Sequence, residues 1–359
     1  MSRPSLAEAI GCWLRERWRA EVALNRFLSG LSGMTWLDLC NRSQRIEKDP
    51  VSGGRVCLWT GSSLLTAARI FPRVGARLLQ KCLVEWPIRF ADRSPAWPSA
   101  AIPRVSFILP VGGGSDRIPQ FRLSIASLLA QVDCPCENIV VEYSVNACYG
   151  PAVPKGCIYH HMPADPQLEG YNKSAAMNVG VQLARADVVV LLDADMVVPE
   201  RLAAWLRERF EQHPELAAMR FARLIFNADE TDSRAMIPSG QLVVPKRIKF
   251  VNQNTPMPLA IRKSAYDEIG GHDESFVGWG GEDVEFLSRL RTLRCSEGGR
   301  LPIVHIWHSF APQKANGHRN LDLLKRTLKL APETRIRRLC NARGSDHSPA
   351  IALPRVPGG

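Results

Sequence analysis

The chain has 359 residues, 45% of them hydrophobic, and a formal net charge of +11, which together fit a folded protein of one large domain or two. It contains no run of about 18 apolar residues, which excludes a membrane-spanning helix, and the charges in MSRPSLAEAIGCWLRERW interrupt any signal-peptide core. We therefore expect a cytoplasmic protein, whose ten scattered cysteines are mostly buried, reduced thiols.

Residues 1–100 form the first region. Segments such as SLAEAIGCWLRERWRAEVALNRFL and GARLLQKCLVEW place apolar residues at helical spacing among arginines, and six of the nine tryptophans lie here. The region holds 15 Lys and Arg against 8 Asp and Glu, a net charge of +7. We predict a basic, Trp-rich helical extension that either packs on a neighbouring domain or contacts a membrane surface.

Residues 92–104, DRSPAWPSAAIPR, contain three prolines and indicate a linker. Short apolar segments typical of strands then alternate with helical ones: VSFILPV, FRLSIASLLAQV, NIVVEYS, YNKSAAMNVGVQLARA and DVVVLLDADMVV. This alternation predicts an α/β domain over residues 101–320 with a mainly parallel sheet flanked by helices. Such sheets bind their ligands at the carboxyl ends of the strands.

Two aspartates, Asp193 and Asp195, lie where the third apolar strand ends. Residues two apart on a strand share a face, so we expect both carboxylates to approach one cation. Oxygen ligands suit Mg²⁺ or Mn²⁺, and such an ion can neutralise a diphosphate. The alternative is that the two acids only cap the following helix, PERLAAWLRERF.

Two histidines, His305 and His308, lie in LPIVHIWHSF near the end of the domain. Imidazole nitrogen is a common ligand for transition-metal ions. On a straight strand, however, residues three apart point to opposite faces. Both side chains can reach one ion only if the chain turns near Trp307; otherwise each is a buried structural histidine.

Four motifs, in this order, carry a resemblance to a known family: YNKSAAMNVG, LLDADM, GWGGEDVEFLSRL and HIWHSFAPQKAN. Together they resemble metal-dependent glycosyltransferases with the Rossmann-like GT-A fold. The likeness is greatest to the β-1,4-galactosyltransferase and chondroitin-type (family 2/7-like) group and its bacterial relatives. It covers about 103–320 and does not extend to the first hundred residues.

The resemblance implies a role for individual residues. Asp195, His305 and His308 would bind Mn²⁺ or Mg²⁺, with Asp193 nearer the ribose or a metal-bound water. His305 stands where some relatives have Met, which would broaden tolerance towards Mg²⁺. On the donor side, the resemblance assigns Tyr171, Lys173 and Asn178 to substrate binding. It also places Arg117 as a phosphate or uridine contact, and Glu142 as the acid that follows the second strand.

In the stretch ESFVGWGGEDVEFLSRLR, the resemblance makes Asp283 the catalytic base. Glu282 would hold an acceptor hydroxyl and Trp279 would cover the sugars. The glycines Gly280 and Gly281, with Gly278, would let the loop fold over the donor and exclude water. The metal and Lys173 would offset the charge on departing UDP. The alternative is that the two acids merely cap the helix that follows.

We therefore predict an inverting transferase that moves a sugar from a UDP-sugar to a saccharide or lipid-linked glycan acceptor, in the synthesis of a surface polysaccharide or glycoconjugate. The donor sugar is galactose, N-acetylgalactosamine, N-acetylglucosamine or glucuronate. Two alternatives are a metal-dependent nucleotidyltransferase and a non-enzymatic protein that binds an anionic polymer. No RNA-binding signature or zinc-finger spacing is present, so we expect no nucleic-acid partner.

The last region, residues 321–359, is predicted to be a basic helical tail and a disordered C-terminus. Residues 313–359 have a net charge of +7, whereas residues 101–312 have −3. The two basic flanks predict peripheral contact with the inner face of a membrane, where lipid-linked acceptors are presented.

Overall fold

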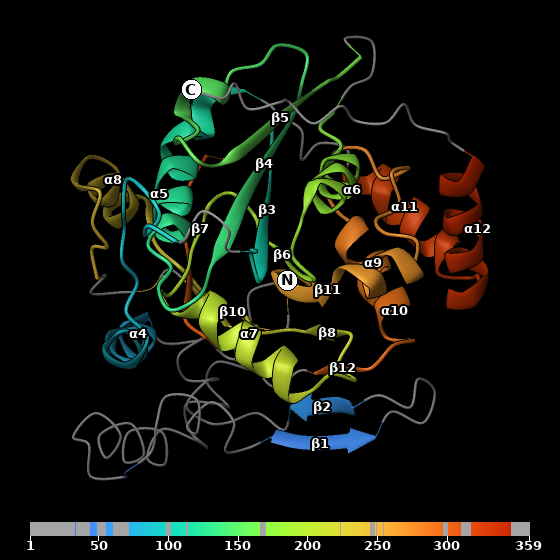
Figure 1. Cartoon of the computed structure of the whole chain (residues 1–359), viewed down its shortest axis with the longest axis horizontal. Coiled ribbons are helices and arrows are strands. Elements are labelled where there is room, and N and C mark those ends of the chain that lie inside the picture. The colour runs from blue at the N-terminus through green and yellow to red at the C-terminus, as the bar shows by residue number, and fades with distance from the viewer. Residues whose placement is uncertain are drawn as a thin grey trace.

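The computed structural model has a central sheet with helices on both sides (Figure 1). It describes residues 33, 44–48, 55–59, 72–97, 102–112, 114–165, 170–222, 224–244, 248, 250–253, 255–296, 301–309 and 317–345.

The larger sheet has seven strands within these residues. In spatial order they are β12 (Cys295–Ser296), β8 (Ala218–Met219), β11 (Leu259–Arg262), β6 (Val188–Leu191), β3 (Val105–Gly112), β4 (Cys136–Ser144) and β5 (Ile158–Pro163). Neighbouring strands are parallel, except that β11 is antiparallel to both its neighbours. The predicted α/β fold with a mainly parallel sheet, consistent with GT-A, is therefore confirmed.

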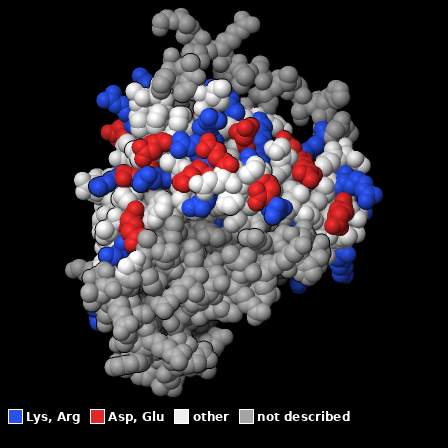
Figure 2. All heavy atoms as spheres, turned by 60° about the horizontal axis from the view of Figure 1, so that its bottom comes forward, with Lys and Arg blue, Asp and Glu red and all other residues white. Residues whose placement is uncertain are grey.

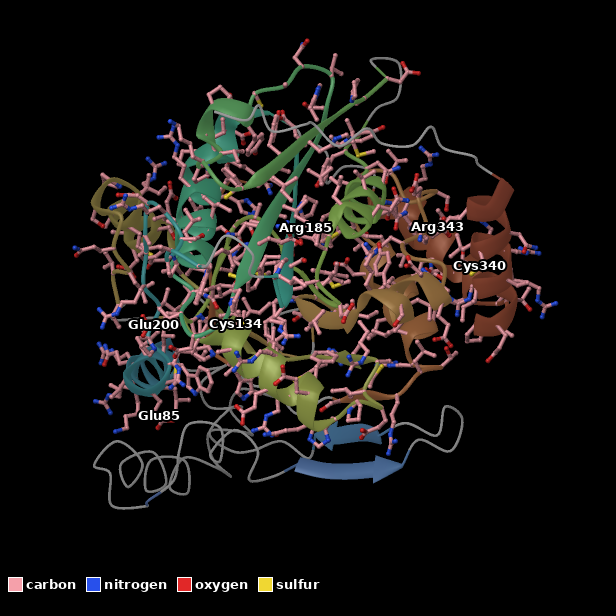
Figure 3. The ribbon with its side chains drawn as sticks, in the orientation of Figure 1. Glu85, Cys134, Arg185, Glu200, Cys340 and Arg343 are labelled. Carbon is pink, nitrogen blue, oxygen red and sulfur yellow. The ribbon has the colours of Figure 1, made fainter. Side chains whose placement is uncertain are left out.

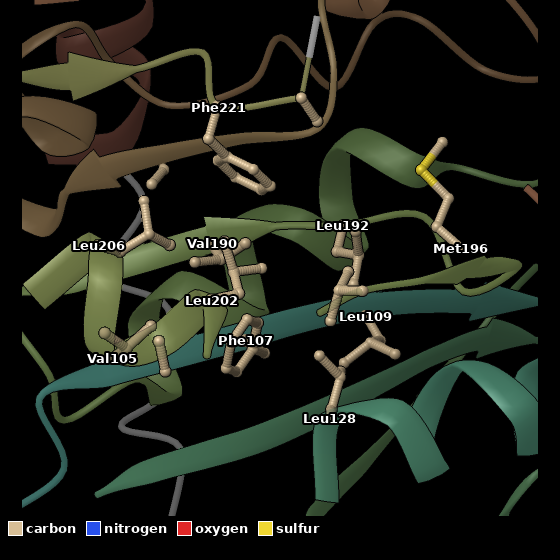
Figure 4. Packing of buried hydrophobic residues seen from close by; sticks show 14 of the residues in the cluster. Val105, Phe107, Leu109, Leu128, Val190, Leu192, Met196, Leu202, Leu206 and Phe221 are labelled. Carbon is tan, nitrogen blue, oxygen red and sulfur yellow. The ribbon is translucent and has the colours of Figure 1, made fainter. Parts of the chain in front are cut away.

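Residues of β3 alternate between the two faces of this sheet, as the period of a strand requires. Phe107 and Leu109 pack towards α5 (Ile118–Leu129) and α7 (Leu202–Gln212), as Figure 4 shows. Ile108 packs on the opposite face, which is covered by three helices. These are α6 (Lys173–Leu183), α9 (Lys263–Glu268) and α10 (Glu282–Leu290).

A smaller four-stranded sheet lies beside the first. Its order is β10 (Phe250–Gln253), β9 (Leu224–Asn227), β13 (Ile303–His305) and β7 (Met196–Val197). Helices α4 (Pro72–Glu85) and α8 (Glu230–Ser239) pack on it, and Leu79, Met236 and Val304 are buried in one cluster. Helix α4 is part of this core although it precedes residue 101, where the sequence places the start of the domain; that boundary stays a prediction.

The predicted helical extension is wrong at two segments. Strands β1 (Gln44–Lys48) and β2 (Arg55–Trp59) pair antiparallel. Their sequences, QRIEK and RVCLW, contain the β-branched and aromatic residues that favour strands. The other helices predicted before residue 72 lie outside the described residues.

The described surface has no feature that settles membrane contact. No helix within the described ranges is both long and apolar enough to cross a bilayer. On the face turned forward in Figure 2, Lys and Arg alternate with Asp and Glu across the described atoms. Peripheral membrane contact through the basic flanks therefore stays a prediction. The cysteines described in the structure are thiols and not disulfides, as expected.

The C-terminal segment forms two helices, α11 (Gly317–Thr327) and α12 (Pro332–Ser345). Helix α12 packs on the α/β domain: Arg343 faces inwards (Figure 3), with its guanidinium 5.8 Å from the centre of the Tyr266 ring. The predicted helical tail is thus an integral part of the fold. The predicted disordered C-terminus after residue 345 lies outside the described residues.

A buried ionic cluster fastens α12 to α10. The Glu285 carboxylate accepts hydrogen bonds from Arg289 at 2.6 Å and from Arg335 at 2.6 Å. All three side chains are almost completely buried, with side-chain exposures of 1%, 0% and 5%. Arg289 also donates to the carbonyls of Ile269 and Gly271. One carboxylate therefore bridges guanidinium groups from two helices.

Replacing Glu285 by alanine should destabilise the fold by about 3–5 kcal/mol, because it leaves two buried guanidinium groups without their carboxylate. Urea unfolding followed by circular dichroism measures this change. Glu211→Ala is the matched control: it removes an exposed ion pair with Arg207 on α7 and should cost about 0.5 kcal/mol or less. Equal effects of the two substitutions would show that the cluster does not hold α12 in place.

Candidate active site

A cavity of about 730 Å³ opens at the carboxyl ends of β3 and β6, where the two sheets meet. It brings together most of the residues predicted for the site: Arg117, Tyr171, Lys173, Asp193, Asp195, Trp279, Glu282, Asp283, His305 and His308. Four predicted residues are not among those that line it: Glu142, Asn178, Gly280 and Gly281.

Asp195 and the two histidines form a compact group. His305 is the last residue of β13 and pairs with Met196 of β7, which brings it beside Asp195. The Nε2 atoms of His305 and His308 lie 3.5 and 3.2 Å from Asp195 Oδ2. One ligand atom from each residue lies within 4.8 Å of the other two. Strand β13 ends at His305, and both imidazoles reach Asp195, so the alternation of a straight strand does not hold between the two histidines.

The hydrogen bonds of this group leave ligand atoms available for a cation. His308 Nδ1 is 2.7 Å from the Ser309 carbonyl, which can only accept a hydrogen bond, so Nδ1 carries the proton. When the ring is protonated, Nε2 donates to the Asp195 carboxylate; when the ring is neutral, as metal binding requires, Nε2 presents a lone pair. Asp195 Oδ1 is buried and has no hydrogen-bond donor among the described residues. These unshared electron pairs fit a divalent cation held by the three side chains.

The carboxyl group of Asp195 is held in its charged form. Burial would raise its pKa, but His305 and His308 hold that pKa well below its ordinary value. Arg117, from the short 3₁₀ helix η1 (Ser115–Arg117), lies 3.8 Å from the same carboxylate. An ionised carboxylate is the form that coordinates a metal ion.

The two aspartates of the D-x-D motif have different partners in the structure, and their approach to one cation stays a prediction. Strand β6 ends at Leu191 and the chain turns at residues 194–195, so the alternation of a strand does not extend to them. Asp193 Oδ1 lies 2.7 Å from Lys173 Nζ, whereas Asp195 faces the histidines. Neither aspartate caps α7, whose N-cap is Arg201.

Lys173 links the D-x-D motif to the acid pair. It is the first residue of α6, where a cation is disfavoured by the helix dipole. Its ammonium contacts Asp193 at 2.7 Å and Asp283 at 3.2 Å. Burial would lower the pKa of Lys173, but Asp193, Asp283 and Glu282 raise it well above its ordinary value. The lysine is therefore charged and bound to carboxylates, in the place where the sequence predicted a nucleotide contact.

Glu282 and Asp283 begin α10, whose N-cap is Gly281 with no side-chain capping bond. Burial and the adjacent Asp283 raise the pKa of Glu282 to about 7. Burial also raises the pKa of Asp283, although the Lys173 ammonium opposes this. Of the two acids, Asp283 is the one that contacts the ammonium, which favours its charged form and leaves a shared proton on Glu282. The pair is therefore more than a helix cap.

The raised pKa of Glu282 predicts a pH-dependent stability. From its ordinary value of 4.5, the pKa rises to about 7, so the folded protein holds this proton more tightly than the unfolded chain does. The resulting stabilisation is complete below about pH 4.5 and is lost as the pH rises through about 7, a change of up to about 3 kcal/mol. Urea unfolding across this range should show that Glu282→Gln removes most of the decline. An unchanged decline in the variant would contradict the raised pKa.

The loop before α10 depends on glycine. Gly278, Gly280 and Gly281 have φ angles of 88°, 95° and 97°, which disfavour other residues. The N–H of Gly278 donates to the Tyr171 carbonyl at 2.9 Å, which fixes the loop over the start of α6. Trp279, 56% exposed, lines the cavity from this loop. Gly280 and Gly281 thus shape the loop without lining the cavity.

Helix α11 supports the same loop, which the sequence did not predict. Asn320 is 1% exposed and its Nδ2 donates to the Val277 carbonyl at 3.1 Å. A Cβ atom added at Gly317 would lie 3.6 Å from the Trp279 ring. The start of α11 therefore lies directly against the Trp279 loop.

Asn178 is buried and is not among the residues that line the cavity, and its role in substrate binding stays a prediction. It lies in the second turn of α6 and is 3% exposed. Its Oδ1 accepts from Tyr266 Oη at 2.6 Å and from the His272 N–H at 2.9 Å, while Nδ2 donates to Glu274 at 2.6 Å. These bonds use its amide to hold the segment that leads into the Trp279 loop.

Glu142 is likewise internal. It is fully buried and accepts hydrogen bonds from Tyr159 Oη at 2.6 Å and from the N–H of Tyr149 at 3.0 Å, as well as from Ser144 and Cys148. Burial would raise its pKa, but these hydrogen bonds lower it below the ordinary value. Its carboxylate therefore supports the cavity wall at Tyr149, near η2 (Gly150–Ala152), and does not reach the cavity.

Several lining residues were missed by sequence reasoning: Gly112, Asp116, Tyr149, Asn227, Thr255 and Met257. Gly112 could have been predicted from the sequence, because it starts a glycine run directly after an apolar strand. A Cβ atom there would collide with the Tyr143 carbonyl and lie 2.7 Å from the Tyr171 ring. The others belong to none of the four motifs: Asn227 ends β9, Asp116 lies in η1, and the rest lie in loops far apart in the sequence.

Comparison with known families gives one match. Residues 155–302, less than half of the chain, match the family model described as "Glycosyltransferase like family 2". The matched segment contains the D-x-D motif and the Trp279 loop, and ends before His305. A comparison with curated proteins gives no significant match. With the α/β fold, the family match supports a GT-A-type glycosyltransferase, a class of enzyme that transfers sugar from a nucleotide-sugar donor to a glycan acceptor.

Proposed function

We propose that the protein is an inverting, metal-dependent glycosyltransferase that moves a sugar from a UDP-sugar to a hydroxyl group of a saccharide acceptor. Among glycosyltransferases it would belong with the β-1,4-galactosyltransferase and chondroitin-type group. It would act in the synthesis of a surface polysaccharide or glycoconjugate. The observation that supports it most is that Asp195, His305 and His308 share one cavity with Lys173 and Asp283. Transfer from a diphosphate donor needs both a cation at the leaving group and a base at the acceptor.

The cation would be held by Asp195, His305 and His308, and a mixed oxygen and nitrogen ligand set suits Mn²⁺ or Mg²⁺. When bound, the ion supplies positive charge that offsets the charge of the departing diphosphate. Arg117 lies close enough to Asp195 to add charge at the same point.

Asp283 would act as the general base. As the acceptor hydroxyl attacks the anomeric carbon, its proton passes to the Asp283 carboxylate and the bond from that carbon to the diphosphate oxygen breaks. UDP leaves with the bonding electrons, and attack from the opposite face inverts the anomeric configuration. The raised pKa of Asp283, caused by burial, makes this carboxylate a stronger base than an exposed aspartate.

Glu282 and Trp279 would position the acceptor. With a pKa of about 7, Glu282 holds a proton part of the time and can donate a hydrogen bond to a sugar oxygen. The indole of Trp279, which is 56% exposed at the cavity, offers an apolar surface on which a sugar ring can lie. Lys173 would keep Asp283 ionised between turnovers.

Turnover with four UDP-sugars tests the proposal: UDP-galactose, UDP-N-acetylgalactosamine, UDP-N-acetylglucosamine and UDP-glucuronate. We expect Mn²⁺-dependent release of UDP with one of them, and a product linkage, read by NMR, with the anomeric configuration opposite to that of the donor. A retained configuration would remove Asp283 from its role as base. Failure of all four donors in the presence of an acceptor panel would contradict the UDP-sugar assignment.

A further inference from the structure

The metal-binding group depends on the backbone at Trp307. Strand β13 ends at His305, and His308, three residues further along the chain, also reaches Asp195. The Ile306 N–H donates to the Asp195 carbonyl at 2.9 Å, so the chain stays in contact with β7 up to this point. Beyond Ile306, contacts from other elements hold the backbone.

Two buried side chains hydrogen-bond the backbone of Trp307, one at its N–H and one at its carbonyl. The Trp307 N–H donates to Ser233 Oγ at 2.8 Å, and the Trp307 carbonyl accepts from Gln120 Nε2 at 3.1 Å. Ser233 is fully buried in α8 and Gln120 is 7% exposed in α5. The two helices lie side by side at the same edge of the molecule (Figure 1). Each contact uses a donor or acceptor that the strand ladder no longer satisfies.

A third contact holds the side chain of the same residue. The guanidinium of Arg234, the neighbour of Ser233 in α8, lies 5.8 Å from the centre of the Trp307 ring. Backbone and side chain of Trp307 are therefore both held by helices that contribute no metal ligand. Neither Gln120 nor Ser233 lines the cavity, so neither is placed to touch a substrate.

We propose that Gln120 and Ser233 are positioning residues that hold the backbone of Trp307 and so bring His305 and His308 onto one cation. The inference rests on the proposed metal site. Without the Ser233 hydroxyl, the Trp307 N–H loses its acceptor, and the backbone at Trp307 can shift, which moves the adjacent His308 away from Asp195. Loss of the Gln120 amide has the same effect at the carbonyl.

The test is Mn²⁺ affinity in the presence of UDP, measured by the electron paramagnetic resonance signal of free Mn²⁺. Ser233→Ala and Gln120→Leu should each weaken Mn²⁺ binding by about 10–100-fold, the usual effect of losing an outer partner of a metal ligand. Ser233→Thr keeps the hydroxyl acceptor and should bind Mn²⁺ nearly as the unchanged protein does.

Ser106→Ala is the matched control for lost stability. Ser106 is also fully buried and hydrogen-bonded, to Glu137, but lies near the start of β3, at the end away from the cavity. It should lower the thermal midpoint about as much as Ser233→Ala does while leaving Mn²⁺ affinity unchanged. Stability loss alone therefore cannot produce the expected difference.

The outcomes separate this inference from the proposed function. If His308→Ala abolishes Mn²⁺ binding while Ser233→Ala and Gln120→Leu leave it unchanged, the metal site stands and the positioning role is overturned. If the unchanged protein binds no Mn²⁺ with UDP, the metal site of the proposed function fails, and the positioning role fails with it.

Discussion

Replacing Asp283 by asparagine is expected to reduce glycosyl transfer by about 10²–10⁴-fold, while Mn²⁺ and UDP bind within about twofold of their original affinity. Asparagine has nearly the same shape as aspartate but cannot take the acceptor proton. The carboxylate contacts Lys173 and not the metal-binding group, so binding of the nucleotide should persist. Single-turnover rates and calorimetric titration with UDP measure the two quantities separately.

Asp273→Asn is the control for this substitution. Asp273 lies ten residues earlier, outside the cavity, and its carboxylate accepts hydrogen bonds from Ser275. The same chemical change there should leave transfer within about twofold, because no proton passes through this group. Transfer by Asp283→Asn within about tenfold of the unchanged enzyme would mean that another group is the base, and Glu282 would be the next to replace.

Removal of a metal ligand is expected to have the second large effect. Asp195→Asn and His308→Ala should each abolish transfer at ordinary metal concentrations. Each should also weaken Mn²⁺ binding more than loss of a residue that only holds a ligand in place, which costs about 10–100-fold. Chelation by EDTA should abolish transfer by the unchanged enzyme, and added Mn²⁺ should restore it. The physical reason is that the departing diphosphate would lose its main positive partner.

His213→Ala is the matched control for His308→Ala. The His213 side chain is 49% exposed and pairs with Glu215 beyond the end of α7, away from the cavity. It should change neither Mn²⁺ affinity nor transfer. Full activity of the unchanged enzyme in EDTA, or of His308→Ala without added metal, would show that the reaction does not use this site.

The architecture of the catalytic domain follows from local patterns. Short apolar strands with intervening helical periodicity predicted β3, α5, β4 and α6 in their observed positions. The same pattern placed the D-x-D motif at the end of a buried strand, and therefore at the edge of the sheet where the cavity opens. These features depend on residues close together in the sequence.

Other features depend on contacts that the sequence does not display. The pairing of α4 with the smaller sheet needs β7 and β13, which follow it by more than a hundred residues. The separation of Asp193 from Asp195 arises from a turn between two sheets, not from a rule of strand geometry. The convergence of His305 and His308 was predicted only on the condition that the chain turns near Trp307.

The individual roles of acids were the least predictable. Glu142 and Glu282 are both buried glutamates near strand or helix ends, yet their surroundings shift their pKa values in opposite directions. Glu142 accepts several hydrogen bonds that favour its charge, whereas Glu282 lies beside a second carboxylate. Such differences come from the packed structure, and Lys173, bound to Asp193 and Asp283, is a further example.

The most direct measurement of the central claim is the electron spin-echo modulation of Mn²⁺ bound to the protein with UDP. The spectrum should contain couplings from two imidazole nitrogens, one of which is lost in His305→Ala and one in His308→Ala. A spectrum without imidazole nitrogen, unchanged by either substitution, would show that the cation is bound elsewhere and would contradict the account.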